Sequence, residues 1–217
     1  MGLFSPDSIL MRGLNMIANI VILHFIWLLF SLPIFTIGAS TTALYYTSMK
    51  LIRTGEGYLF QNFFKSFKEN FKQSTIIWLV MLLVGFLYIT DIRYGFFLNN
   101  MIGKIMIVGC SIFLIPCVLI ALYIFPVQAK FENTIFENLK LSLLMSLRHI
   151  GLSLVLLLII GTIGFLGFFF RPFMGVMLIC GMGITAYFTS NVFIMIFRKY
   201  IPEELETDLE KSGNRFE

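Results

Sequence analysis

Few polar side chains lie inside the apolar stretches of this sequence, and those few are the residues that could do chemistry. Asn15, Asn19 and His24 share one such stretch, with the two asparagines four residues apart and so on one face of a helix. The set predicts either an intramembrane polar stripe facing a solute cavity or side chains that hydrogen-bond neighbouring helices. The asparagines favour the second interpretation, and His24 fits both.

The inventory of reactive side chains argues against catalysis. The chain has 2 histidines and no His-Glu-x-x-His, Gly-x-Ser-x-Gly or Walker sequence, so the usual constellations for metal, acyl and phosphoryl chemistry are missing. Cys110, Cys117 and Cys180 fall within apolar stretches and lack Cys-x-x-Cys spacing. We therefore expect no enzyme, no metal site, no cofactor and no disulfide framework.

Membrane-spanning helices must position these residues. A helix needs about twenty apolar residues to cross about 30 Å of hydrocarbon, and five stretches reach that length: 14–37, 75–97, 102–125, 152–170 and 172–197. Only 13% of the residues are charged, because charge is costly inside a span. The sequence predicts an all-α fold, a polytopic membrane helix bundle of five transmembrane helices plus cytoplasmic interfacial helices. We expect a single bundle over 1–200 and a short acidic cytoplasmic tail over 201–217.

The basic residues predict the orientation of the chain. Most of the 16 Lys and Arg residues lie in connections on one side, and only Arg12, Arg93, Lys104 and Arg171 lie on the other. Because basic connections are retained in the cytoplasm, we expect a multi-pass protein of the bacterial cytoplasmic membrane with its N-terminus outside and its C-terminus inside. The net charge of +4 is then a topology signal, and no nucleic-acid partner is expected.

The longest basic connection contains an aromatic stripe. Its phenylalanines recur at helical spacing and lysines follow one flank: Phe60, Phe63, Phe64, Phe67 and Phe71, with Lys65, Lys68 and Lys72. This pattern predicts a cytoplasmic helix that lies at the membrane interface or docks on the bundle. We take Phe63, Phe64, Phe67 and Lys68 as candidate partner-docking residues. A weaker stripe follows later, at Ile135, Phe136, Leu139, Leu143 and Leu147.

Two shorter features remain open at this level. Residues 62–68 and 142–148 share a pattern at an offset of 80 residues, which indicates either a parallel internal repeat or a chance likeness between two membrane-entry segments. Residues 38–53 begin with a run of small and polar side chains. They form either a partly re-entrant segment covered by protein or an ordinary helix hairpin with Ser40 as N-cap, ended by the turn Thr54-Gly55-Glu56-Gly57.

Several segments resemble one family. They are Phe35-Thr36-Ile37-Gly38-Ala39-Ser40-Thr41-Thr42-Ala43-Leu44-Tyr45-Tyr46, Gly55-Glu56-Gly57-Tyr58, Phe63-Phe64-Lys65-Ser66-Phe67-Lys68-Glu69-Asn70-Phe71-Lys72-Gln73 and Phe125-Pro126-Val127-Gln128-Ala129-Lys130-Phe131-Glu132-Asn133-Thr134. Together they resemble the YesL-type family of uncharacterised bacterial integral membrane proteins, although the family commonly has Pro where this chain has Ala39.

The resemblance implies a role but no site. Members of the family tend to be encoded beside sugar-importing ABC systems and glycan-degrading enzymes. The expectation is an accessory or regulatory component of ABC-type carbohydrate transport, with importer permease or ATPase subunits as partners. The alternative is a small-solute transporter or substrate-binding membrane subunit that uses the stripe of Asn15, Asn19 and His24.

Overall fold

The computed structural model describes residues 9–55, 57–98 and 100–200, and every regular element within them is helical. The elements are α1 (Ile9–Phe30), the 3-10 turn η1 (Ile34–Thr36), α2 (Ile37–Thr54), α3 (Leu59–Leu98), α4 (Met101–Lys130), α5 (Ile135–Arg148), α6 (Ile150–Phe169) and α7 (Arg171–Phe197). The predicted all-α fold is confirmed. The tail predicted at 201–217 lies outside the described residues.

Five helices are long and apolar enough to cross a membrane, namely α1, α3, α4, α6 and α7. Their apolar side chains mostly face outward: Phe97 and Phe168 are 82% and 86% exposed. Exposed apolar surface on this scale is rare in a soluble monomer and marks contact with lipid or protein. The five helices thus indicate a multi-pass membrane protein in a lipid bilayer.

The first predicted span is too long at its carboxyl end. α1 stops at Phe30, seven residues before the predicted limit of 37, and Pro33 then precedes η1. Proline has no N–H to donate and disfavours helical backbone in the residue before it. The Thr36 hydroxyl donates to the carbonyl oxygens of Phe30 and Pro33, both at 2.6 Å, and so satisfies groups that the break leaves without helical partners.

The segment after this break is a regular helix. α2 starts at Ile37 with Thr36 as N-cap, so the N-cap predicted at Ser40 is wrong. α2 ends as expected at the glycine turn, where Gly55 takes φ 69° and its N–H bonds to the Leu51 carbonyl at 3.0 Å. This left-handed C-cap suits glycine, which lacks the Cβ that would strain it.

The predicted cytoplasmic helix and second span are one element. α3 runs for 40 residues, or about 60 Å, twice the thickness of the hydrocarbon core. No proline interrupts residues 59–98, which leaves nothing to separate an interfacial helix from the span. The predicted helix is thus confirmed but is not a separate element, and its packing against Phe30 of α1 agrees with the predicted docking on the bundle.

The second basic connection is built differently. Thr134 and Glu137 form a capping box that starts α5, and the chain breaks at His149 before α6. Two separate helices therefore stand where residues 59–98 form one, and no counterpart of α2 lies between α4 and α5. The likeness between residues 62–68 and 142–148 is thus not matched by a repeated arrangement of helices.

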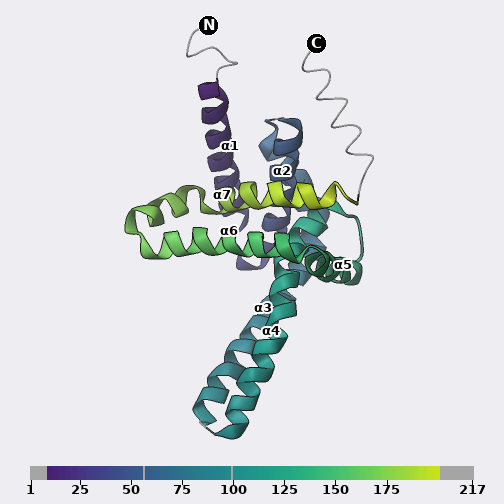
Figure 1. The fold of residues 1–217 in the computed structure, drawn as a ribbon. Coiled ribbons are helices and arrows are strands. Elements are labelled where there is room, and N and C mark those ends of the chain that lie inside the picture. The colour runs from purple at the N-terminus through teal and green to yellow at the C-terminus, as the bar shows by residue number, and fades with distance from the viewer. Residues whose placement is uncertain (1–8, 56, 99, 201–217) are drawn as a thin grey trace.

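The helices meet in a shared core around α2 (Figure 1). A methyl group on Gly38 would lie 2.5 Å from the Ser74 carbonyl oxygen, so glycine allows α2 to approach α3 closely. Phe193 of α7 packs edge-on against Tyr45 of α2 and Tyr123 of α4, with ring centres 5.8 and 5.1 Å apart. From this core the α3–α4 and α6–α7 hairpins project in different directions (Figure 1).

Candidate functional site

Small polar side chains, not a continuous apolar face, line much of the core. Buried polar residues include Ser40, Thr42, Thr47 and Ser48 on α2, Asn62, Ser66 and Ser74 on α3, Gln128 on α4, Asn138, Ser142 and Ser146 on α5, and Thr189 and Ser190 on α7. Lipid is as apolar as leucine, so burying apolar side chains gains little there and helices associate through small and polar residues. The polar core is therefore the surface through which the helices recognise one another.

Hydrogen bonds between helices use part of this polar core. Thr42 and Ser74 join α2 to α3 at 2.9 Å between their hydroxyl oxygens. Tyr123 of α4 bonds to Ser153 of α6 at 2.9 Å, and the Ser153 hydroxyl also lies 2.9 Å from the Ser146 carbonyl. Burial raises the pKa of Tyr45 more than the hydrogen bond from Thr189 lowers it, so the Tyr45 phenol stays neutral in this core.

Another part of the polar core has no partner. Both amide atoms of Gln128 and of Asn138, and the hydroxyls of Ser48, Ser142 and Ser190, are buried and make no hydrogen bond to the described residues. Leaving a buried polar group unpaired costs about 1–3 kcal/mol. These side chains either lower the stability of the fold or meet hydrogen-bonding groups from outside the chain.

The sequence prediction missed the polar face of α5. The predicted stripe turns outward at Phe136 and Leu147, which are exposed, while Asn138, Ser142 and Ser146 face the core. Their spacing of four residues was visible in the sequence as a polar stripe, which in a membrane protein indicates a buried face.

The three residues of the predicted intramembrane stripe have different surroundings in the structure. His24 is buried, and its Nε2–H donates to the Leu178 carbonyl of α7 at 3.0 Å, which requires the proton on Nε2. Its ring also stacks on Trp27, with centres 6.0 Å apart. Asn19 is half-buried and Asn15 is exposed. His24 thus joins α1 to α7, and the structure does not gather all three residues around one cavity.

The predicted docking residues are divided in the same way. Phe63 is fully buried and Phe67 half-buried, and both rings pack against Phe30 at the end of α1, with centres 5.4 and 4.9 Å from its ring. Phe64 is 47% exposed and Lys68 is exposed. Only these last two remain accessible to a partner, so the inner half of the stripe holds α1 in place.

The outer half of the stripe forms a continuous surface, called the aromatic-basic surface below. Phe60 and Phe64 stack with their planes 5° apart and their centres separated by 6.1 Å. The surface consists of exposed rings and exposed lysines along the amino-terminal half of α3: Phe60, Phe64, Lys65, Lys68, Phe71 and Lys72. Apolar rings beside flexible cations suit contact with a protein groove that carries acidic residues, or with anionic lipid headgroups.

A comparison with known families covers this part of the molecule. Residues 20–92 match the family model described as "Protein of unknown function, DUF624". The chain is similar to that uncharacterised family over a region that holds the carboxyl-terminal half of α1, all of α2 and most of α3. No curated protein and no solved structure matches the chain. The similarity therefore includes the aromatic-basic surface and the Phe30 contact but names no activity.

The described residues hold no group of three or more His, Cys, Asp or Glu side chains that could bind a metal ion.

His149, at the start of α6, contacts Tyr200 with Nε2 3.1 Å from the phenol oxygen. Burial, with Lys199 and Arg148 nearby, lowers the pKa of His149. Its imidazole is neutral at physiological pH and joins the end of α5 to the residues after α7.

Proposed function

We propose that this protein is an accessory or regulatory membrane component that associates with an ABC-type carbohydrate importer. The proposal is based on the aromatic-basic surface. This surface lies on the part of α3 that extends beyond the span, and its rings and lysines are exposed and can contact a partner. It lies within the region that matches the family model. The resemblance to proteins encoded beside sugar importers supplies the class of partner.

The orientation belongs to the same proposal. With the N-terminus outside, the amino-terminal half of α3, all of α5 and the carboxyl ends of α4 and α7 face the cytoplasm. The aromatic-basic surface is then presented to the cytoplasmic side of an importer, where its permease loops and ATPase subunits lie. Its lysines complement acidic residues there, and its rings supply buried contact area.

Affinity purification in mild detergent with quantitative mass spectrometry tests the proposal. The test variant is Phe64→Asp, Lys68→Glu, which replaces an apolar ring with a carboxylate and reverses one charge, both at exposed positions of the surface. A matched control is Phe97→Asp, Lys104→Glu, which makes the same changes at exposed positions near the far end of the α3–α4 hairpin.

We expect importer subunits with the wild type and the control, and at least tenfold less with the test variant, as for an interface residue worth about 1.4 kcal/mol or more. Equal recovery with all three proteins would contradict docking through this surface. Recovery of no importer subunit with the wild type would contradict the association itself.

One observation favours the alternative of a small-solute transporter or substrate-binding subunit. The unpaired amides of Gln128 and Asn138 are the kind of groups that bind polar solutes such as sugars. Flux or binding in proteoliposomes of the purified protein, abolished by replacing both amides with leucine, would support this second function. Flux unchanged by those replacements would remove the site.

A further inference from the structure

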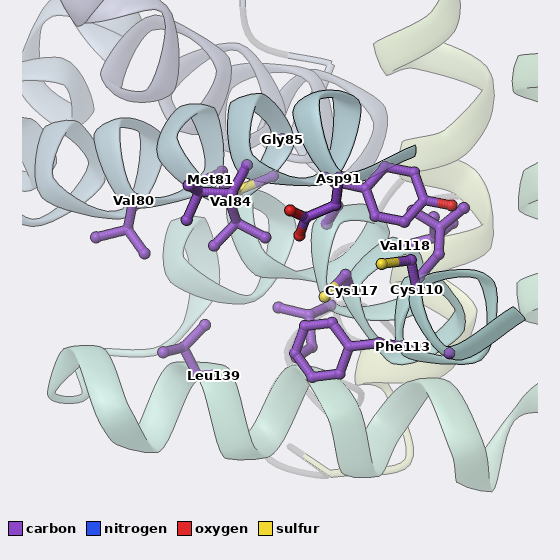
Figure 2. A pocket seen from close by; sticks show the side chains of 16 residues that line it. Val80, Met81, Val84, Gly85, Asp91, Cys110, Phe113, Cys117, Val118 and Leu139 are labelled. Atoms are coloured by element: carbon purple, nitrogen blue, oxygen red, sulfur yellow. The ribbon is translucent and has the colours of Figure 1, made fainter. Parts of the chain in front are cut away.

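A cavity of about 630 Å³ lies between α3 and α4, within two membrane-spanning helices and away from the aromatic-basic surface. Its walls are almost entirely apolar, with side chains such as Val80, Val84, Phe113 and Val118 (Figure 2). This volume falls in the range of about 300–1,000 Å³ that is usual for small-molecule sites.

The sequences of the two helices explain why a groove forms there. Near the hairpin end, Gly95 and Gly103 bring the backbones of α3 and α4 into direct contact. Further along, Pro116 lies inside α4, where it cannot donate a helix hydrogen bond and favours a bend. Gly85 and Gly109 line the groove, and a methyl group on either would meet no atom within 4 Å. The groove is thus open where glycines replace bulkier side chains.

One acidic side chain projects into this apolar groove. Figure 2 shows the Asp91 carboxylate pointing from α3 into the space on the side where α4 presents Cys110 and Cys117. No hydrogen bond or ion pair to Asp91 occurs among the described residues. Arg93 follows two positions later and so lies about 200° around the helix. A carboxylate within a membrane-spanning segment is costly unless it finds a cation.

The length of the groove matches one acyl chain of a lipid. The lining on α3 extends from Val80 to Asp91, about 16 Å along the axis, which is close to half of a hydrocarbon core of about 30 Å. An acyl chain that follows the groove through one leaflet has this length.

We propose that the α3–α4 groove binds a phospholipid with a primary ammonium headgroup. One acyl chain occupies the apolar length of the groove and the ammonium pairs with Asp91. The surrounding membrane supplies the occupant. The apolar walls select a hydrocarbon chain, and the carboxylate selects a headgroup that carries an ammonium. An anionic lipid of the same chain length makes the same apolar contacts, but its headgroup is repelled by the Asp91 carboxylate.

Native mass spectrometry of the full-length protein tests the proposal with phosphatidylethanolamine and phosphatidylglycerol of identical acyl chains. Asp91→Asn removes the charge. Gly85→Leu fills the groove at a position open to a larger side chain, and Gly161→Leu on α6 is the matched control, since it also meets no atom within 4 Å and does not line the groove.

We expect the wild type to prefer the ethanolamine lipid about fivefold, as for one exposed ion pair of about 1 kcal/mol. Asp91→Asn should abolish the preference, Gly85→Leu should remove the preferred adduct, and Gly161→Leu should behave as the wild type. An Asp91→Asn variant that keeps the preference, or equal binding of both lipids by the wild type, would overturn the proposal.

A second measurement uses the wild-type chain and its own thiols. Cys110 and Cys117 line the groove, whereas Cys180 on α7 does not, and all three are free and partly buried. Ethanolamine lipid should slow alkylation of the first two by a membrane-permeant maleimide and leave Cys180 unchanged, while glycerol lipid at the same concentration should slow the first two less. Equal slowing at all three thiols, or by both lipids, would contradict the assigned site. A groove occupied by a partner helix would show protection only in native membranes, which would also overturn the proposal.

Discussion

Replacing Asn138 with leucine should stabilise the protein. Asn138 is fully buried on α5 and neither amide atom has a hydrogen-bond partner in the chain. Leucine has the same branched shape and the same number of heavy atoms. Removing an unpaired buried polar group recovers about 1–3 kcal/mol, and the larger methyl groups return part of that through crowding. A net gain of about 1–2 kcal/mol corresponds to about 2–8 °C in Tm for a chain of this size.

Asn62 supplies the matched control for this prediction. It is also buried, but its Oδ1 accepts from the Lys50 ammonium at 2.9 Å. Asn62→Leu removes a bond to a charged group, so it should cost about 1.5–3 kcal/mol and lower the Tm. Thermal unfolding of both variants in one detergent measures the two shifts. If Asn138→Leu lowered the Tm as much as Asn62→Leu does, the Asn138 amide would have a partner beyond the protein, and the reasoning would be refuted.

Three further predictions concern helix contacts and pH. Gly183→Ala should lower the Tm by a crowding cost of about 1–3 kcal/mol, since the new methyl would press on the Ile20 carbonyl of α1, whereas Gly175→Ala meets no atom within 4 Å and should be neutral. Hydrogen bonds from the N-cap of α5 lower the pKa of Glu137. The carboxylate therefore stabilises the fold above its ordinary pKa, and this stabilisation is lost as the pH falls through the lowered pKa of the folded state. Glu137→Gln should flatten the acid side of a plot of Tm against pH. Burial lowers the pKa of His149 from 6.5, so the folded state binds this proton more weakly than the unfolded state does. Stability should therefore fall as the pH drops below about 6.5. If the Tm of His149→Gln fell with pH as steeply as that of the wild type, His149 would not be the cause of the pH dependence.

The sequence predicted where helices cross the membrane better than where they end. Exclusion of charge from hydrocarbon leaves a long apolar run, which identifies a span whatever its neighbours are. Two ends differed because local signals competed with that run. Pro33 stopped α1 inside apolar sequence, and the absence of any breaker before residue 75 let α3 continue through a polar connection.

Which side of each helix is buried was harder to predict, because in lipid the apolar side of a helix need not point toward the core. In water the apolar stripe of a helix points inward, but in lipid both sides of a helix meet apolar surroundings. Phe63 and Phe64 are adjacent and chemically identical, yet the first is fully buried and the second half exposed. Both rings contact Phe30 at the end of α1, with centres 5.4 and 6.1 Å away, so their difference in exposure comes from packing between distant segments, which no local pattern contains. The groove at Asp91 likewise depends on the Gly95–Gly103 contact between α3 and α4.

Thiol accessibility in intact cells tests most directly the claim that the aromatic-basic surface lies on the cytoplasmic side of a five-span protein. Lys68→Cys and Lys104→Cys, each in a background with the native cysteines replaced by serine, place single exposed thiols near opposite ends of the α3–α4 hairpin. A membrane-impermeant maleimide should label the second thiol in intact cells and the first only after permeabilisation. Labelling of Lys68→Cys in intact cells, with Lys104→Cys protected, would reverse the orientation and contradict docking to the cytoplasmic side of an importer.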